Sequence, residues 1–375
     1  MNDKGHRAKV TEAKTLTRRT AAGYKLEQLT DSAGFESQHT YYDICPWRHD
    51  ERAIVFSRVP VGGRWVEFGH DGLACPDGRV CLLDTETNDI REVAGPAVYM
   101  RHGGAYCMWN PTRRRIYYRR DREHSVGLDL ETGDEHLLPG RIRQLSPDGN
   151  WFALMTRPAH GGSQGAGVGV LPEAGGEVDE IVTREQLHAL TPNRDQFTPE
   201  DMLLGNTKWR PDGEHLLIAM WVYPVPDAKR SIYVVRRDGG DVRWLCHFGG
   251  HHSWTPDGSR VLFVDEPGAE ARNGQGRFLH TVNFDGSDKR QIFDQPAGSH
   301  PLLHPDNNRV VDFDERGVYM VHLDEQRIER LVDFTAPFDT THHGTHAHPV
   351  WNHTGDQVLF NSAETGHSEV YRLTL

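Results

Sequence analysis

Histidine is the residue type in this sequence whose number and grouping most suggest chemistry. The chain has 375 residues and 23 histidines, and the two densest groups are His251-His252 and the run from His342 to His348. A neutral imidazole is a common ligand of first-row divalent metals, and its pKa near ambient pH suits a general base. The grouped histidines are therefore candidates for a metal centre, for a catalytic base, or for both.

The elements that must position these histidines come from an internal repeat. An aromatic or leucine anchor is followed two residues later by a Pro-Asp-Gly-like turn and then by an apolar, β-rich run. Copies recur about every 51 residues, and their anchors are Trp47, Trp109, Leu145, Trp209, Trp254, Leu303 and Trp351. Most copies precede a second hairpin, so each period holds four short antiparallel strands, which is typical of a propeller blade. The sequence predicts an all-β fold, a seven-bladed β-propeller.

The ends of the chain predict how this ring closes. The last repeat ends with residues 369–375, which supply a third strand and no fourth, while residues 23–30 alternate like a strand. We expect this N-terminal strand to complete the last blade and to protect two sheet edges. Residues 1–20 are predicted to be a flexible tail, and residues 21–375 a single domain. In the longest interval, Thr183 and Thr198 carry the signals of helix starts.

Counting three residues back from each anchor places histidines in one register. These positions are Ile44, Tyr106, Ile142, Asn206, His251, His300 and His348. The first strand of each blade lines the central channel, so equivalent positions converge on the axis. Three consecutive repeats thus bring histidine to the same place; His346 shares the face of His348 by the strand period of two, and His343 lies in the loop before it.

Two interpretations of this register remain open. His300, His343, His346 and His348 could surround one divalent ion, for which zinc, manganese, iron and nickel are all chemically suitable. Alternatively, the imidazoles could form hydrogen bonds with one another and with ordered water in a polar channel.

Further candidates lie near the first strands. His39, His102 and His252 are candidate substrate contacts, and Lys208, Arg210, Arg230 and Arg101 could supply positive charge to an anionic ligand. Taken singly, each cation is equally explained as a solvated surface residue.

Composition narrows the class of protein. The formal net charge of −12 argues against nucleic-acid and membrane-surface partners, and no run approaches the 18 apolar residues of a membrane span. The five cysteines are an odd number without metal-type spacing, and the N-terminus is charged without an apolar signal region. We expect a cytoplasmic protein with free thiols; the sequence leaves the oligomeric state open.

Several motifs resemble one known family, the oligogalacturonate lyases, which are intracellular, manganese-dependent, seven-bladed polysaccharide lyases of pectin degradation. The resemblance covers nearly the whole chain at low identity. It is strongest in the segments 345–349 (THAHP), 298–300 (GSH), 251–258 (HHSWTPDG), 39–42 (HTYY) with Cys45, and 20–30. Of these, the THAHP segment is the most specific.

The resemblance implies roles for individual residues. His300, His346 and His348 match the family's three histidine ligands, and His343 stands where the family has a glutamine ligand. His251 matches the catalytic base. The family's arginine aligns with Ser231, with Arg230 adjacent, so Arg230 is the catalytic candidate there. The implied cofactor is a divalent metal, Mn²⁺ first, with Zn²⁺, Ni²⁺ and Fe²⁺ as alternatives.

The implied reaction is β-elimination from a uronate-containing oligosaccharide, an anionic substrate. Two alternatives stand beside it. One is another metal-dependent carbohydrate enzyme on the same scaffold, such as a glycoside hydrolase or an epimerase. The other is a non-catalytic, TolB-like binding propeller, which would show no metal dependence. Paired carboxylates at the channel would favour hydrolysis, and no repeat places one in the three-back position.

Overall fold

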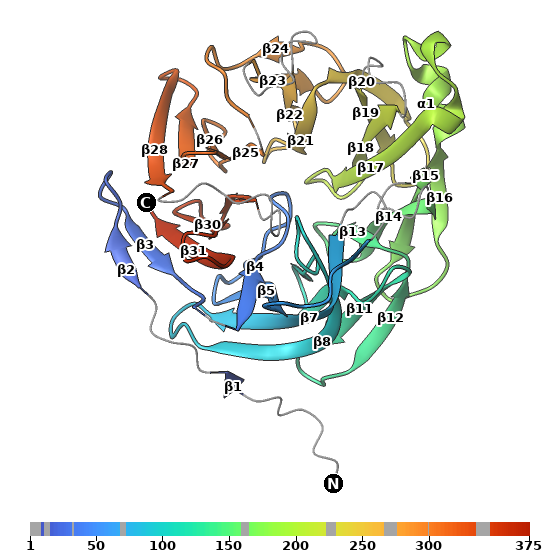
Figure 1. Cartoon of the computed structure of the whole chain (residues 1–375). Helices are drawn as coiled ribbons and strands as arrows, with labels where there is room; N and C mark the ends of the chain where they lie inside the picture. The colour runs from blue at the N-terminus through green and yellow to red at the C-terminus, as the bar shows by residue number, and fades with distance from the viewer. Residues whose placement is uncertain are drawn as a thin grey trace. The chain divides into compact units, whose positions relative to one another are not determined.

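Strands make up nearly all of the regular structure, which confirms the predicted all-β class (Figure 1). The computed structural model describes residues 9–10, 16–31, 34–67, 73–158, 165–222, 230–265, 276–298, 300–334 and 346–375. The chain divides into two compact units; the first comprises residues 1–139, 311–321 and 328–375, and the second residues 140–310 and 322–327. None of the helices in the described ranges is long and apolar enough to cross a membrane.

The first unit contains three antiparallel sheets. One has the order β1-β8-β7-β5-β4, with β6 beside β7: β1 (Lys9–Val10), β4 (Phe35–Gln38), β5 (Ala53–Pro60), β6 (Val66–Glu67), β7 (Leu73–Asp84) and β8 (Ile90–Met100). The next contains β9 (Met108–Trp109), β10 (Arg115–Arg119), β11 (His124–Asp129) and β12 (Glu135–Pro139). The third has the order β2-β3-β31-β30-β29: β2 (Thr17–Arg19), β3 (Lys25–Gln28), β29 (Val350–Trp351), β30 (Gln357–Ser362) and β31 (Glu369–Thr374).

The second unit contains an eight-stranded and a four-stranded sheet. The larger holds β13 (Ile142–Leu145), β14 (Trp151–Pro158), β15 (Gly165–Pro172), β16 (Asp179–Thr183), β17 (Met202–Trp209), β18 (His215–Val222), β19 (Arg230–Arg236) and β20 (Arg243–Phe248). The smaller holds β21 (Gly250–Trp254), β22 (Arg260–Asp265), β23 (Phe278–Asn283) and β24 (Arg290–Gln291). The chain also forms β25 (Leu302–Leu303), β26 (Arg309–Asp314), β27 (Gly317–His322) and β28 (Arg327–Asp333).

The described strands form six sheets, so the seven separate sheets that the repeats predict are not found. The reason is that β15 also pairs with β17, through Gly165 and Leu204, which joins two repeats into one sheet. The blade count of seven therefore remains a prediction.

The predicted closure by an N-terminal strand is confirmed. β3 pairs antiparallel with β31, with Lys25 opposite Thr374 and Gln28 opposite Tyr371. The prediction that residues 1–20 form only a tail is wrong in part, because β2 pairs with β3 and Lys9–Val10 pairs with the edge of β8. Unpaired strand edges leave backbone groups unsatisfied, and these additional strands cover them.

The helix signals in the longest interval, between the anchors Leu145 and Trp209, are also confirmed. The α1 helix (Arg184–Leu190) begins at Thr183, which forms a capping box with Gln186. A second capping box, at Thr198, begins the short 3-10 helix η3 (Pro199–Asp201). Another short 3-10 helix, η2 (Arg194–Gln196), precedes it.

The tryptophan anchors have a structural role that explains their recurrence. The indole of Trp109 donates to the carbonyl of Pro46, 2.9 Å away, and that of Trp254 donates to the carbonyl of Lys208, 3.1 Å away. In both cases the acceptor immediately precedes the anchor of the previous repeat. At these two anchors the buried aromatic ring fills the space between consecutive repeats, and its single donor is satisfied there. The Nε1 of the buried anchor Trp209 has no hydrogen-bond partner among the described residues. Apolar cores of β-branched and aromatic residues surround these contacts.

The closing sheet contains a buried ion pair, which gives a test of its importance. The Arg372 Nη2 and Glu27 Oε2 atoms lie 3.0 Å apart, with both side chains less than a tenth exposed. We predict that Glu27→Gln lowers the free energy of unfolding by about 3–5 kcal/mol, because Arg372 is left buried without its counter-charge. Urea titration followed by tryptophan fluorescence measures this change.

The matched control is Glu364→Gln in the turn between β30 and β31, whose partner Arg18, on β2, is half exposed. This change should cost no more than about 1 kcal/mol. Equal losses in the two variants would contradict the importance assigned to β3.

Candidate metal and catalytic site

Four of the seven three-back positions have a left-handed backbone. The φ angles are 51° at Tyr106, 47° at Asn206, 28° at His251 and 45° at His348. At Asn206 and His251 the register between the first and second strands also shifts, as in a β-bulge. Non-glycine residues at positive φ cost about 1–3 kcal/mol, and such strain is concentrated at functional sites. The fold thus repeats one strained conformation at four equivalent positions, two of which carry the candidate histidines His251 and His348.

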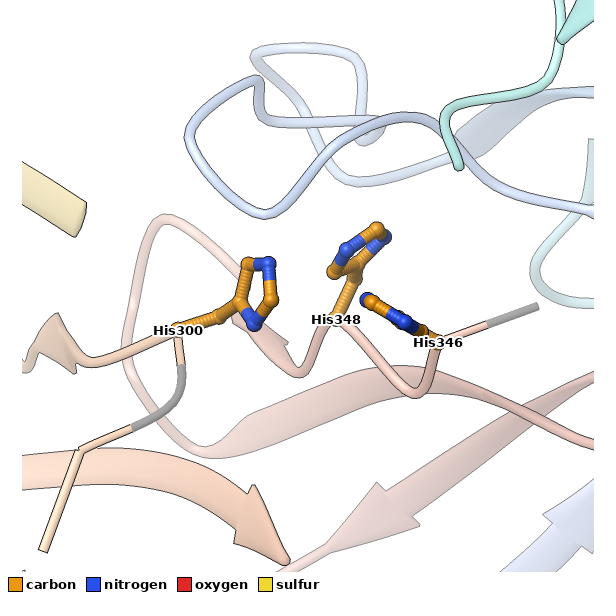
Figure 2. Close-up of side chains that lie close together, drawn as sticks. All are labelled: His300, His346 and His348. Atoms are coloured by element: carbon orange, nitrogen blue, oxygen red, sulfur yellow. The ribbon is translucent and has the colours of Figure 1, made fainter. Parts of the chain in front are cut away.

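His346 and His348 form the histidine pair of the first unit. Their ligand nitrogens lie within 4.8 Å of one another, and their ring centroids are 5.3 Å apart (Figure 2). His348 is fully buried, whereas His346 is half-buried. The ring of His102 lies 4.5 Å from that of His346, and the ring of Tyr41 meets the ring of His348 edge-on at 4.6 Å.

Burial keeps two imidazoles of this unit, those of His346 and His39, neutral. It lowers the pKa of His346 to about 4, with smaller contributions from the charges of His102 and Arg101. Burial also lowers the pKa of His39 to about 4. A metal ligand must offer a free lone pair, so a neutral imidazole is the form that binds a cation.

His251 and His300 form the histidine pair of the second unit. Their ring centroids are 3.8 Å apart and the ring planes differ by 37°. His300 is buried and His251 is half-buried. The predicted base and one of the predicted ligands are therefore in direct ring contact.

The predicted catalytic arginine, Arg230, bonds to the backbone that precedes His251. Arg230 is exposed at the start of β19, and its Nη1 donates to the carbonyl of Gly249 at 2.5 Å. Gly249 lies two residues before His251, so this bond supports the backbone that leads to the base. Ser231, which aligns with the family arginine, is buried, and its hydroxyl lies 3.1 Å from His247 Nδ1.

Three predicted substrate contacts are enclosed by protein. His39 is 0% exposed, His252 is 1% exposed, and Lys208 is 3% exposed. The Nε2 atom of His252 lies 3.1 Å from the carbonyl of Asn206, so this imidazole has a hydrogen-bond partner within the second unit. These side chains support the first strands, and only His102 of the predicted histidine contacts is partly open to solvent.

Arg210 and His343 complete the set of predicted residues. Arg210 lies at a Pro-Asp-Gly turn, where it donates to the carbonyl of Gly258, pairs with Asp212 and covers the ring of Phe284 at 4.1 Å. This explains its charge as part of the turn. His343 lies outside the described residues.

The structure adds three side chains that the sequence prediction did not include. Tyr41 touches His348, Phe313 has its ring 6.0 Å from His346, and the buried Asn361 donates to the carbonyl of His346. A signal for Asn361 was present, because an amide there interrupts the apolar run Val358-Leu359-Phe360. Tyr41 lies in the segment 39–42 that carries the resemblance, although nothing in the sequence indicated its contact with His348. Phe313 occurs in an ordinary apolar context and had no such signal.

The comparisons with known proteins are consistent on the fold. An oligogalacturonate lyase in complex with manganese matches with a TM-score of 0.73 at 18% identity over 97% of each chain. The oligogalacturonate lyase of Vibrio parahaemolyticus matches with the same score at 16% identity over 97% of each chain. The β-propeller domain of the Trilobed protease from Pyrococcus furiosus matches with a TM-score of 0.53 at 12% identity, over 90% of this chain and 95% of that one.

The chain has a β-propeller fold. The resemblance to the oligogalacturonate lyases is thereby confirmed at the level of the propeller fold, over almost the full length of the chain. No protein-family model and no curated protein sequence matches the chain.

The buried His39 gives a test of the electrostatics of the propeller. Its pKa of about 4 in the folded state lies below the value near 6.5 of an unfolded chain. Between these pH values the unfolded chain binds a proton that the folded chain does not, so stability falls as pH falls. We predict that His39 alone accounts for a loss of about 2 kcal/mol between pH 7 and pH 5.

Urea midpoints of the metal-free protein at both pH values measure this loss. The His39→Phe variant should lose less stability than the wild type over the same interval. The exposed His49 provides the control for the substitution itself, as the variant His49→Phe. An identical pH dependence in wild type and His39→Phe would rule out this origin.

Proposed function

We propose that this propeller is a metal-dependent lyase that cleaves a uronate-containing oligosaccharide by β-elimination. The observation that carries the proposal is the set of in-register histidines: His251 is in ring contact with His300, and His346 and His348 lie side by side. A binding scaffold does not need histidines at equivalent repeat positions, whereas a base that acts beside metal ligands requires several imidazoles.

The proposed ligands are His300, His346 and His348, which are the three candidates drawn in Figure 2. Within the first unit, His346 and His348 lie close enough together to offer two imidazole nitrogens to one ion, and His300 is the third ligand that we propose. Three protein ligands would leave positions open for substrate, as catalytic metal sites require. We propose Mn²⁺ as the metal, supported by the manganese complex of the similar lyase, with Zn²⁺, Ni²⁺ and Fe²⁺ as competent alternatives.

Elimination from a 4-linked uronate requires a base and a means of handling the substrate's charge. The proton at C5 is weakly acidic while the neighbouring carboxylate is charged; a bound divalent cation would supply Lewis-acid neutralisation of that charge. The half-buried His251 is the proposed base, and it would take the C5 proton as the C4–O4 bond breaks. The electron pair of the C5–H bond would form the C4–C5 double bond, and the departing O4 would take a proton from water. Its backbone is supported by the bond from Arg230 to Gly249, so we assign Arg230 a supporting role.

The proposed substrate is an anionic oligosaccharide, and the proposed location is the cytoplasm. All five cysteines are free, as expected of thiols in a reducing compartment. The sugar and linkage are what a panel of uronate oligosaccharides would identify.

The first test measures near-UV absorbance while the manganese-loaded protein is mixed with uronate oligosaccharides. Elimination creates a C4–C5 double bond conjugated to the carboxylate, so absorbance should rise, whereas hydrolysis would leave it flat. We predict that His251→Ala lowers the rate by about 10²- to 10⁴-fold, the usual contribution of a general base.

The control for this test is His280→Ala in the same sheet; the Nδ1 of His280 lies 3.1 Å from the carbonyl of Phe278, and its ring stacks on Phe263. This variant should retain the wild-type rate. Unchanged elimination in His251→Ala would refute the assignment of the base, and a flat trace for the wild type with every sugar would favour hydrolysis or binding alone.

The second test removes the metal. We predict that a chelator abolishes the absorbance rise and that added Mn²⁺ restores it. Single alanine variants of His300, His346 and His348 should each weaken Mn²⁺ binding in calorimetric titrations, because each removes one nitrogen ligand. Exposed His353, in the turn after Trp351, is the control, and His353→Ala should bind Mn²⁺ as the wild type does. Chelator-resistant activity would contradict the metal requirement.

A further inference from the structure

The pair of candidate ligands in the first unit lies on backbone that belongs to no strand. Residues 346–349 have no regular secondary structure, and β29 begins only at Val350. The backbone of His348 is also strained, with φ at 45°. Something other than a regular β-ladder must therefore hold the two imidazoles in position.

Asn361, on the neighbouring strand β30, supplies bonds to this segment. Its backbone N–H donates to the carbonyl of Ala347 at 2.8 Å, and its side-chain Nδ2 donates to the carbonyl of His346 at 3.1 Å. Its Oδ1 accepts from the backbone N–H of His39 at 3.0 Å. The residue is 0% exposed. One planar amide thus connects the ligand segment with the residue that follows β4.

Comparing Asn361 with the equivalent residues of the other repeats shows which of its bonds the fold requires. The residue ten positions after each anchor is Ser57, Arg119, Met155, Ala219, Val264, Phe313 or Asn361. The backbone N–H of Arg119 donates to the carbonyl of Ala105 at 2.9 Å, just as that of Asn361 donates to Ala347. The backbone bond is therefore shared by two repeats. At the equivalent position, the Ser57 hydroxyl also accepts from a backbone N–H, that of Ala105 at 2.9 Å, whereas Asn361 is the residue that donates to the carbonyl of a candidate ligand.

Burial of the Asn361 amide is unfavourable unless its polar atoms form hydrogen bonds. Burying an amide without hydrogen bonds costs several kcal/mol, and apolar side chains occupy the equivalent positions Ala219 and Val264. The fold alone therefore does not require an amide here. The two bonds also fix its orientation, because only one rotamer places the oxygen toward an N–H and the nitrogen toward a carbonyl.

We propose that Asn361 is a positioning residue of the metal centre: its amide holds the His346–His348 segment in the conformation that presents both imidazoles to one ion. This inference rests on the proposed function. Groups behind the ligands typically change metal affinity by 10- to 100-fold when they are replaced.

The experiment titrates the metal-free, full-length protein with Mn²⁺ by calorimetry and with Co²⁺ by visible spectroscopy. Asn361→Leu removes both side-chain bonds at similar volume. Asn361→Asp keeps an acceptor for His39 and loses the donor to His346. We expect each variant to bind Mn²⁺ at least about tenfold more weakly than the wild type and to change the Co²⁺ spectrum. The aspartate adds a charge that by itself attracts a cation, so weaker binding there indicates displaced ligands.

The control is Asn352, a second buried amide in the same sheet, which bonds to Glu51, Thr354 and Asp356. Asn352→Leu should lower thermal stability comparably and leave both metal titrations unchanged. Asn361 variants that bind Mn²⁺ with wild-type affinity would overturn this inference and leave the proposed lyase standing. A wild type that binds neither ion would overturn both.

Discussion

Burial between neighbouring repeats is the constraint on which the rest of this structure depends. A sheet of four short strands cannot bury its two faces alone, so each must pack against the next. The tryptophan anchors show how the register of that packing is fixed. The Trp109 and Trp254 indoles each donate to the carbonyl that immediately precedes the previous anchor. Because the same bond recurs at the same repeat position, residues at a fixed distance from the anchor have equivalent surroundings. The anchor therefore also fixes the position of the side chain three residues before it.

The strained backbone three residues before the anchor belongs to the fold, whereas the side chain at that position determines the chemistry. Tyr106, Asn206, His251 and His348 all have positive φ, although only two of them are histidines. The conformation is thus a property of the repeat, which existing packing maintains. The imidazoles make use of it without any further change of fold. This agrees with the general observation that propellers host many activities, because the chemistry depends on which side chains occupy a common geometry.

The sequence was informative wherever a local pattern had a structural cause. Pro-Asp-Gly turns, alternating strands and the capping box at Thr183 act over a few residues, and the structure has them. Burial was harder to predict. His39, Lys208 and His252 carry polar groups that suggest exposure, and the structure encloses all three, because packing from distant segments decides accessibility. The pairing of β15 with β17 could not be predicted for the same reason, since Gly165 and Leu204 are far apart in the sequence and no local pattern joins them.

The closure of one sheet by β3 and β31 has a consequence for biosynthesis. The paired residues Glu27 and Arg372 are separated by 345 positions, and the same sheet continues into β30 and β29, directly after His348. During translation, β3 leaves the ribosome long before its partner exists, so its edge must stay unpaired until the last segment emerges. The histidine segment then acquires its supporting sheet among the final events of folding. A truncated chain would retain most of the repeats and still lack the framework around His346 and His348.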